Sequence, residues 1–573
     1  MLCVLCVFSL CSSLGQGAQS QRAQQFKSAH GWTNPLTVPL VLSGNFGELR
    51  GNHFHTGLDM KTQGREGLPV LASTDGVLAR VKMSPWGYGN ALYLEGPDGI
   101  TTVYAHLQRF APHVQAWAVA RTYKGRSLGL DATPPASSGL TLQAGDTLGW
   151  SGNSGGSGGP HLHFEIRDTP SQHPLNPLQG WVIKSDSRPP SAPKWWLESE
   201  RGLASVPANG VDTVVVVDDV RVSLEAYDRL DGASNICGIH SLQAVLQDGQ
   251  GEVQWTHRFE LDELNFSVNK DMNAHTLFPV WKRERDQVHR LHRLPGNRLD
   301  IYAGAPDGVV ALDSGEVATL ECTVRDVAGN ETFRTLVLKG GASALLWERL
   351  EFEGVAPQVT SPSDALTLSA PQATLSWEEK AFFEPAEVGW RTDSTGLSAR
   401  VWPEFEAWRG NLDVVWTLPS PEVMWGMSGA ALPQDAWPTT QWVAVHEVEG
   451  QIKQAVPAQV QEGTWRMALP GGGAWRMTRD TVAPKVIPYH SGTPLVQGGD
   501  AVWFVEDLLS GVGTMTLTID GRWARLVWDP KRNMATYEAS DGKHPSGAPV
   551  RVELEVTDAV GNAATWAGTL VWP

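Results

Sequence analysis

The chain has 573 residues, too many for a single hydrophobic core, so we expect several domains. Its formal net charge of -17 argues against nucleic acid as the main partner, and against simple electrostatic attraction to an anionic wall or membrane. The 59 glycines, 37 prolines and 25 tryptophans are typical of a turn-rich protein dominated by β-strands.

The chain begins with an apolar segment. Residues 1–19 contain LCVLCVFSLCSSL, which is too short to span a bilayer and is followed by small residues. We predict a signal peptide cut near Ala18, although no Lys or Arg precedes the apolar core. No later apolar stretch of about twenty residues occurs, so the sequence predicts no transmembrane segment. The expected protein is exported, to the periplasm, the cell surface or the medium.

The first chemically informative segment is HTGLD, which separates His55 and Asp59 by four residues. On a straight strand these side chains would lie roughly 13 Å apart, so we predict a bend at Gly57 if they bind one ion. His53 forms an H-x-H pattern with His55 and is a minor alternative ligand. Arg50 could bind a substrate carboxylate or be a surface or structural arginine.

Strand and turn signals follow. Two hairpins are predicted, at residues 69–83 around Asp75-Gly76 and at residues 87–107 around Asp98-Gly99. They indicate an antiparallel sheet. Residues 111–143 are predicted to be an inserted loop, which could form a wall of a substrate groove or be a neutral surface excursion.

The segment PHLHFEIRD alternates strictly, so His161, His163 and Glu165 share one face of a strand. The two histidines stand about 7 Å apart at the backbone, and one could bind a metal while the other reaches a water or substrate atom. One histidine from this strand, with His55 and Asp59, makes three N and O ligands. Such a set with one open position is typical of catalytic zinc.

Three segments in this order resemble the LytM/lysostaphin-type zinc endopeptidases, which cleave peptide bonds in bacterial cell walls. They are GNFGELRGNHFHTGLDM, GYGNALYLEGPDGITTVYAHL and GNSGGSGGPHLHFEIR, and the resemblance covers about residues 36–170. It implies one Zn²⁺, a zinc-activated water as nucleophile and the peptide stems of peptidoglycan as substrate. The implied metal ligands are His55, Asp59 and His163, and the implied catalytic residues are His106 and His161.

Several alternatives stay open. Some LytM-like domains are non-catalytic regulators of cell-wall amidases, and the chain could also be a binding or adhesion protein dominated by its β modules. Glu165 could orient a ligand imidazole or pair with Arg167. The G-x-S-x-G string around Ser154 resembles a serine nucleophile, but glycines and Pro160 follow it where a helix is needed, which favours a glycine-rich turn.

The composition changes after about residue 185, where RPPSAP indicates a stiff linker. Farther on, CTVRDVAGN and LEVTDAVGN match each other, which suggests repeated sandwich modules of immunoglobulin or fibronectin type. Asp326 and Asp558 in these strings could bind calcium or cap their own turns. Cys237 and Cys322 could form a disulfide or be two buried thiols. Most tryptophans are expected in the module cores.

We therefore predict an all-β, mainly antiparallel protein. A LytM-like open antiparallel sheet is expected at residues 36–185, and β-sandwich or β-rich modules are expected at 190–340, 345–480 and 481–573. Cell-envelope proteins are possible partners of these modules.

Overall fold

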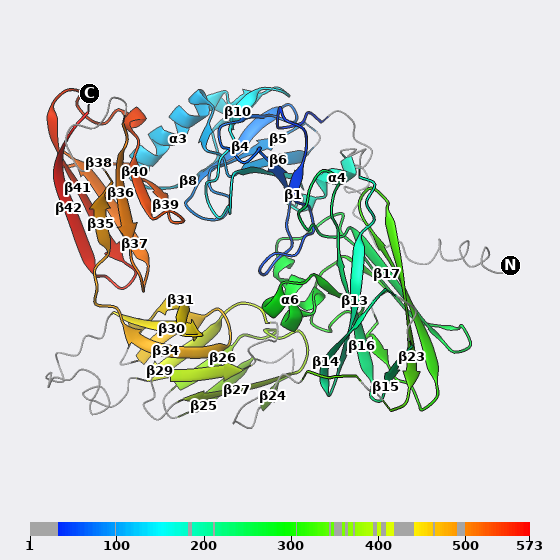
Figure 1. Cartoon of the computed structure of the whole chain (residues 1–573). Coiled ribbons are helices and arrows are strands. Elements are labelled where there is room, and N and C mark those ends of the chain that lie inside the picture. The colour runs from blue at the N-terminus through cyan, green and yellow to red at the C-terminus, as the bar shows by residue number, and fades with distance from the viewer. Residues whose placement is uncertain are drawn as a thin grey trace. The chain divides into compact units, whose positions relative to one another are not determined.

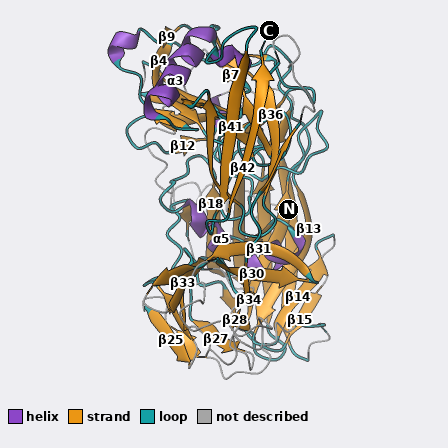
Figure 2. Cartoon of the chain, turned by 90° about the vertical axis from the view of Figure 1, so that its left-hand side faces the viewer, coloured by secondary structure: helices purple, strands orange, loops and turns teal. Residues whose placement is uncertain are grey.

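The computed structural model describes residues 32–572, except for 98, 181–185, 210–212, 305, 343–344, 349–357, 361–364, 371–372, 393–397, 403–407, 418–440, 462–463 and 490–498. The predicted signal peptide lies outside the described residues. Strands make up most of the regular structure and pair mainly antiparallel, which confirms the predicted fold class (Figures 1 and 2). No helix in the described part of the chain is both long and apolar enough to cross a membrane.

The chain divides into two compact units. The first contains the residues up to Lys82, Tyr88–Ala111 and Ala132–Glu351, and the second contains Met83–Gly87, Pro112–Asp131 and the residues from Phe352 onward. The N-terminal sheet and the first β module thus belong to one unit. The boundaries of the individual domains stay a prediction.

The N-terminal sheet runs in the order β1-β2-β11-β6-β5-β4, with β12 paired to β11 and β9 to β4. Strand β11 lies at its centre and pairs antiparallel with β2 on one side and β6 on the other. The strands are β1 Leu42–Gly44, β2 Leu58–Lys61, β4 Gly76–Met83, β5 Ala91–Glu95, β6 Ile100–Ala105, β9 Thr141–Leu142, β11 His161–Asp168 and β12 Pro174–Leu175.

One of the two predicted hairpins is present. Strands β5 and β6 pair antiparallel, as predicted. The hairpin at residues 69–83 was a wrong prediction, because β3 (Pro69–Leu71) pairs with β10 (Thr147–Trp150) in a separate small sheet with β7 (Arg109–Phe110). The Asp75-Gly76 turn therefore moves the chain from one sheet to another.

The insertion at residues 111–143 is not a plain loop. It contains helix α3 (Pro112–Gly125), strand β8 (Leu130–Ala132) and a short 3₁₀ turn at Ala136–Ser138. Proline is well tolerated at the first position of a helix. The buried side chains of α3 recur every four residues, at Val114, Ala118 and Thr122, so one narrow face of the helix is buried.

The first β module contains two sheets, in the orders β14-β13-β16-β19 (with β21 on β16) and β15-β23-β22-β17-β18-β20. Two short helices, α5 (Met272–His275) and α6 (Phe278–Glu284), lie between β18 and β19. The strands are β13 Ser191–Ser199, β14 Gly202–Pro207, β15 Thr213–Val216, β16 Val220–Tyr227, β17 Ser241–Asp248, β18 Val253–Glu260, β19 Val288–Arg290, β20 Tyr302–Ala303, β21 Val309–Val310, β22 Val317–Arg325 and β23 Glu331–Gly340.

The second module also has two sheets, in the orders β24-β27-β28-β34-β30-β31 and β25-β26-β29-β33-β32. The buried rings of Trp377, Trp416, Trp465 and Trp475 belong to its core, as expected for such tryptophans. Its strands are β24 Gln358–Thr360, β25 Leu366–Ala370, β26 Ala373–Trp377, β27 Ala386–Thr392, β28 Ser398–Trp402, β29 Leu412–Thr417, β30 Trp442–Val448, β31 Gln451–Pro457, β32 Gln459–Gln461, β33 Thr464–Leu469 and β34 Gly473–Arg479.

The third module has the sheets β35-β36-β40-β39 and β38-β37-β41-β42. Its D-x-x-G-N turn joins β41 to β42 just as the matching turn of the first module joins β22 to β23, so the two matching strings form similar hairpins. The strands are β35 Lys485–Pro488, β36 Ala501–Glu506, β37 Val512–Ile519, β38 Arg522–Ala524, β39 Val527–Asp529, β40 Met534–Tyr537, β41 Pro549–Asp558 and β42 Ala563–Val571. The immunoglobulin-like character of the modules stays a prediction.

The two described cysteines, Cys237 and Cys322, are buried free thiols. Of the two interpretations left open by the sequence, the structure therefore favours thiols over a disulfide.

Candidate metal centre

Three of the predicted side chains meet at one point in the N-terminal sheet. His163 of β11 lies directly opposite Asp59 of β2 in the strand pairing, and His55 precedes β2. His55 Nε2 lies 3.0 Å from His163 Nδ1 and 3.1 Å from Asp59 Oδ1, and the last two atoms are 2.9 Å apart. All three residues are buried. Backbone register thus brings together side chains that are 104 residues apart in sequence.

The donor set fits a metal ion. A tetrahedral zinc with bonds near 2.0 Å would hold its ligand atoms about 3.3 Å apart, slightly farther than the distances observed here. His55 Nδ1 donates to the carbonyl oxygen of Asn45 at 2.7 Å, and His163 Nε2 donates to Glu165 Oε1 at 2.8 Å. These bonds turn the other ring nitrogen of each histidine toward the centre. His55, Asp59 and His163 could therefore bind a metal.

The charges at the cluster of His55, Asp59 and His163 favour a cation. Burial raises the pKa of Asp59, but His55 and the hydrogen bonds from His161 and His163 outweigh burial and hold that pKa well below its usual range. Burial lowers the pKa of His163, but its bonds to Asp59 and Glu165 outweigh burial and raise the pKa to about 9. A proton therefore occupies the His163–Asp59 contact when no metal is bound, and a metal must displace that proton.

His106 and His161 lie beside this cluster. Their ring centroids are 4.8 Å apart, and His161 Nε2 is 3.3 Å from Asp59 Oδ1. The Nδ1 atom of His106 donates to the carbonyl of Ser154 at 2.8 Å, and that of His161 donates to the carbonyl of Gly159 at 2.8 Å. The Nε2 atom of His106 is left as an acceptor, whereas that of His161 faces the carboxylate of Asp59. Burial, with the neighbouring His163 and His161, lowers the pKa of His106 to about 3, so His106 is neutral at pH 7.

Glu165 is a fully buried acceptor behind the metal ligands. Besides His163, it accepts hydrogen bonds from Thr56 Oγ1 at 2.6 Å, Tyr88 OH at 2.5 Å and Arg167 Nε at 2.6 Å. Both open interpretations of Glu165 thus apply together, since it orients an imidazole and pairs with an arginine. The roles of Thr56 and Tyr88 were not predicted, because no short motif connects either residue to Glu165.

The first β module contributes residues that the sequence analysis did not connect with the site. Asn269 accepts from the backbone N–H of Phe54 at 3.0 Å and donates to its carbonyl at 3.1 Å, next to His55. The ring of Phe266 lies 4.6 Å from the guanidinium carbon of Arg167. No local pattern predicts these contacts, because they depend on packing between segments that are far apart in the sequence, 215 residues in the case of Phe54 and Asn269.

Three minor candidates are placed by the structure. Arg50 donates to Asp59 Oδ2 at 2.7 Å, so it belongs to the metal centre, with 34% of its side chain exposed. His53 is exposed and contacts Asn52 instead of the cluster. Ser154 donates its hydroxyl to the carbonyl of Leu107 at 2.8 Å, which agrees with a structural turn and not with a nucleophile.

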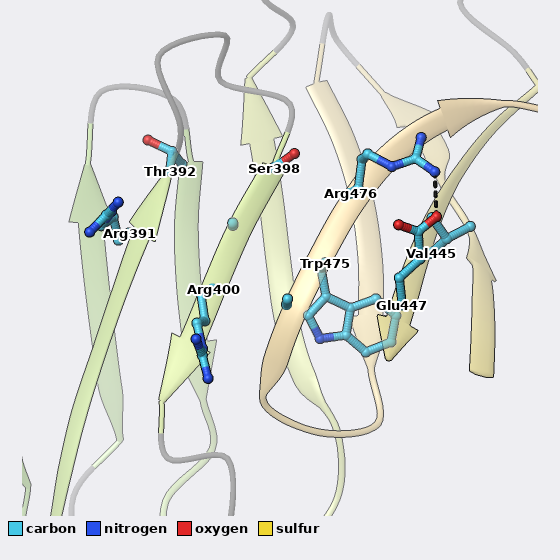
Figure 3. A pocket seen from close by; sticks show the side chains of 10 residues that line it. Arg391, Thr392, Ser398, Arg400, Val445, Glu447, Trp475 and Arg476 are labelled. Carbon is cyan, nitrogen blue, oxygen red and sulfur yellow. Dashed lines mark hydrogen bonds and ion pairs between the residues drawn. The ribbon is translucent and has the colours of Figure 1, made fainter. Parts of the chain in front are cut away.

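A pocket of about 340 Å³ lies elsewhere, on sheet strands β27, β28, β30 and β34 of the second module (Figure 3). Its lining includes Arg391, Arg400 and Arg476, and Arg476 pairs with Glu447 at 2.6 Å. None of the predicted site residues lines this pocket.

Comparison with known proteins gives matches to the N-terminal part of the chain. The family model described as peptidase family M23 matches residues 53–130. The DD-carboxypeptidase/endopeptidase Mpg of Neisseria meningitidis serogroup B is 35% identical over 124 residues, which are 22% of this chain and 22% of that protein. The glycyl-glycine endopeptidase ALE-1 of Staphylococcus capitis is 28% identical over 155 residues, 26% of this chain and 33% of that protein.

Solved structures match about a quarter of the chain. The catalytic domain of lysostaphin from Staphylococcus simulans is 23% identical, with a TM-score of 0.17, and the match covers 29% of this chain and 98% of that one. The catalytic domain of the M23 protein EnpA from Enterococcus faecalis is 24% identical, with a TM-score of 0.19, over 26% and 96% of the two chains. This chain thus spans from about a fifth to a third of the length of the two curated relatives above.

Proposed function

Because residues 53–130 form part of a peptidase M23 domain of the LytM/lysostaphin family, we propose that this chain is a zinc-dependent endopeptidase that hydrolyses peptide cross-links of bacterial peptidoglycan. The observation that carries the proposal is the convergence of His55 Nε2, Asp59 Oδ1 and His163 Nδ1, with two further histidines beside them. The names of the relatives, an endopeptidase and a glycyl-glycine endopeptidase, support the substrate class.

His55, Asp59 and His163 would hold the zinc ion, which when bound supplies a water of lowered pKa and polarises the scissile carbonyl. Asp59 provides the single negative charge among these ligands, and Arg50 holds its other oxygen. The pairing of His163 with Glu165 fixes the ring so that Nδ1 faces the ion.

His106 and His161 would handle protons and developing charge. Each has its Nδ1 fixed by a backbone carbonyl, so each presents Nε2 toward the reacting atoms in a defined orientation. One takes the proton of the attacking water, and the other stabilises the oxyanion or protonates the leaving amine.

The chain would act in the periplasm or outside the cell, where peptidoglycan lies. Its β modules would there contact cell-envelope proteins.

The experiment compares purified wild-type chain with His163→Ala, His106→Ala and His161→Ala. Wild type should carry one zinc per chain and release peptides from isolated sacculi. His163→Ala should lose zinc, whereas His106→Ala and His161→Ala should keep zinc and lose at least about 100-fold in hydrolysis. His53→Ala, at the exposed neighbouring histidine, is the matched control and should behave as wild type.

Two results would favour the alternatives. Wild-type chain without stoichiometric zinc would favour a non-catalytic regulator of amidases. Zinc-loaded wild type that releases nothing from sacculi but binds them or another envelope protein would favour a binding or adhesion role for the β modules.

A further inference from the structure

Three aspartates of the first β module form a cluster outside the M23 domain motifs. Asp186 precedes β13, Asp228 follows β16, and Asp326 follows β22. One carboxylate oxygen from each lies within 4.8 Å of the others. Strands β13 and β16 belong to one sheet of the module and β22 to the other, so the cluster joins both sheets.

The hydrogen bonds of this cluster are incomplete. Asp326 accepts from the backbone and side-chain nitrogens of Asn330 at 2.9 and 2.7 Å, and Asp186 Oδ1 accepts from backbone N–H groups. By contrast, Asp228 Oδ1 and Asp186 Oδ2 are buried and have no hydrogen-bond partner among the described residues. Asp228 is only 1% exposed. A buried carboxylate oxygen without a partner is costly, and a bound cation would offset that cost.

Charge in the cluster supports the same conclusion. Burial raises the pKa of Asp228 to about 7, and the carboxylates of Asp326 and Asp186 add to the increase. A hydrogen bond from the backbone N–H of Arg229 and the guanidinium of Arg188 partly offset this increase. Three carboxylates therefore face one another with only partial compensation from the protein.

The third module repeats the arrangement. Asp480, Asp507 and Asp558 also offer oxygens within 4.8 Å of one another. Asn562 Nδ2 donates to the carbonyl of Asp480 at 3.0 Å, and Asn330 Nδ2 makes the matching bond to the carbonyl of Asp186 at 3.1 Å. The same backbone frame thus surrounds three aspartates in two modules, although the carboxylates of the third module have more backbone partners.

We propose that Asp186, Asp228 and Asp326 bind a calcium ion. All the ligands are hard oxygen atoms, which excludes a preference for zinc, and they come from three separate segments, which suits the adaptable coordination of Ca²⁺ better than the strict octahedron of Mg²⁺. The ion neutralises the buried carboxylates. It links the segment before β13, which contains Asp186, to the ends of β16 and β22, which Asp228 and Asp326 follow. The site is independent of peptide hydrolysis.

The full chain is first treated with EGTA, freed of EGTA by gel filtration and reloaded with zinc. CaCl₂ is then titrated in, bound calcium is measured by calorimetry, and the unfolding temperature Tm is measured with and without calcium. Wild type should bind one calcium ion more per chain than Asp228→Asn. Calcium should also raise the Tm of wild type by more than it raises the Tm of the variant. Without calcium, Asp228→Asn should be at least as stable as wild type, because the substitution removes repulsion. If Asp228 had a purely structural role, the calcium-free variant would be less stable than calcium-free wild type.

Asp300→Asn makes the same chemical change at an exposed position of the module and should keep full calcium binding. If Asp228→Asn fails to fold, Asp186→Asn serves instead, because that side chain is less buried; it should weaken calcium binding by at least about tenfold. Equal calcium stoichiometry in wild type and a folded variant would overturn the site. An equal Tm increase with MgCl₂ would overturn the choice of calcium.

Discussion

At the scale of single residues, the metal centre depends on how each imidazole is fixed. His55 and His163 present different ring nitrogens to Asp59, because one binds the carbonyl of Asn45 through Nδ1 and the other binds Glu165 through Nε2. Glu165 is itself held by Arg167, so a buried ion pair stands behind the ligand. Hydrogen-bond partners outside this cluster therefore decide which ring nitrogen each histidine turns toward Asp59.

We predict that the stability gained from zinc increases between pH 6.5 and 9. The pKa of His163 is raised to about 9, above its unfolded value near 6.5, so its proton stabilises the metal-free protein fully below pH 6.5 and less as pH rises to 9. Zinc on His163 replaces that proton. Calorimetric Tm values of zinc-loaded and metal-free chain should diverge over this interval, and a constant difference would contradict the assignment.

At the scale of elements, the site is a product of the β2–β11 pairing. Gly57, expected to provide a bend, is required by close approach: a Cβ there would lie 2.4 Å from the carbonyl oxygen of Phe164 and 3.1 Å from His163 Cε1. Gly57→Ala should therefore separate the strands, cost about 1–3 kcal/mol in the free energy of unfolding and reduce bound zinc. Gly51→Ala, where a Cβ meets nothing within 4 Å, is the matched control. Equal stability and zinc content in both variants would refute this role.

A second element acts from the first β module. The 3₁₀ turn at Asn269–Asp271 begins at Asn269. The side-chain amide of this residue forms hydrogen bonds with both the backbone N–H and the backbone carbonyl of Phe54. Asn269→Ala should leave these buried groups unpaired, lower the free energy of unfolding by about 1–3 kcal/mol and reduce hydrolysis through the position of His55. The exposed neighbour gives the control Lys270→Ala. Unchanged unfolding and activity in Asn269→Ala would show that the module does not support the site.

At the scale of the whole molecule, most of the N-terminal sheet and the first module belong to one compact unit. Asn45 exchanges two 2.7 Å hydrogen bonds with the backbone of Gly238, and Asn176 Nδ2 donates to the carbonyl of Leu261 at 3.0 Å. The buried character of these contacts indicates a permanent interface and not a flexible tether.

We predict that a fragment of residues 32–342 keeps zinc and unfolds in one transition, whereas a fragment of residues 32–185 has a clearly lower Tm and binds zinc less tightly. Both fragments lack the second and third modules, so any difference in Tm or zinc binding between them is due to the first module. Equal Tm values in scanning calorimetry would refute a stabilising interface.

The sequence by itself determined the composition of the site and the fold class. Alternation placed His161, His163 and Glu165 on one strand face, and the ordered motifs identified His55, Asp59 and His106, because period-2 patterns and motif spacing are local properties. Glycine, proline and tryptophan content indicated the β-rich modules, and the paired D-x-x-G-N strings revealed two related hairpins.

Only the tertiary structure decided the rest. It paired β3 with β10 instead of β4, formed a helix in the predicted loop, left Cys237 and Cys322 as thiols, and brought Asn269 to Phe54. Each of these outcomes depends on contacts between segments that are distant in sequence. Local propensity contains no information on which distant partner a strand edge or a buried polar group will meet, because that choice is made when the layers pack.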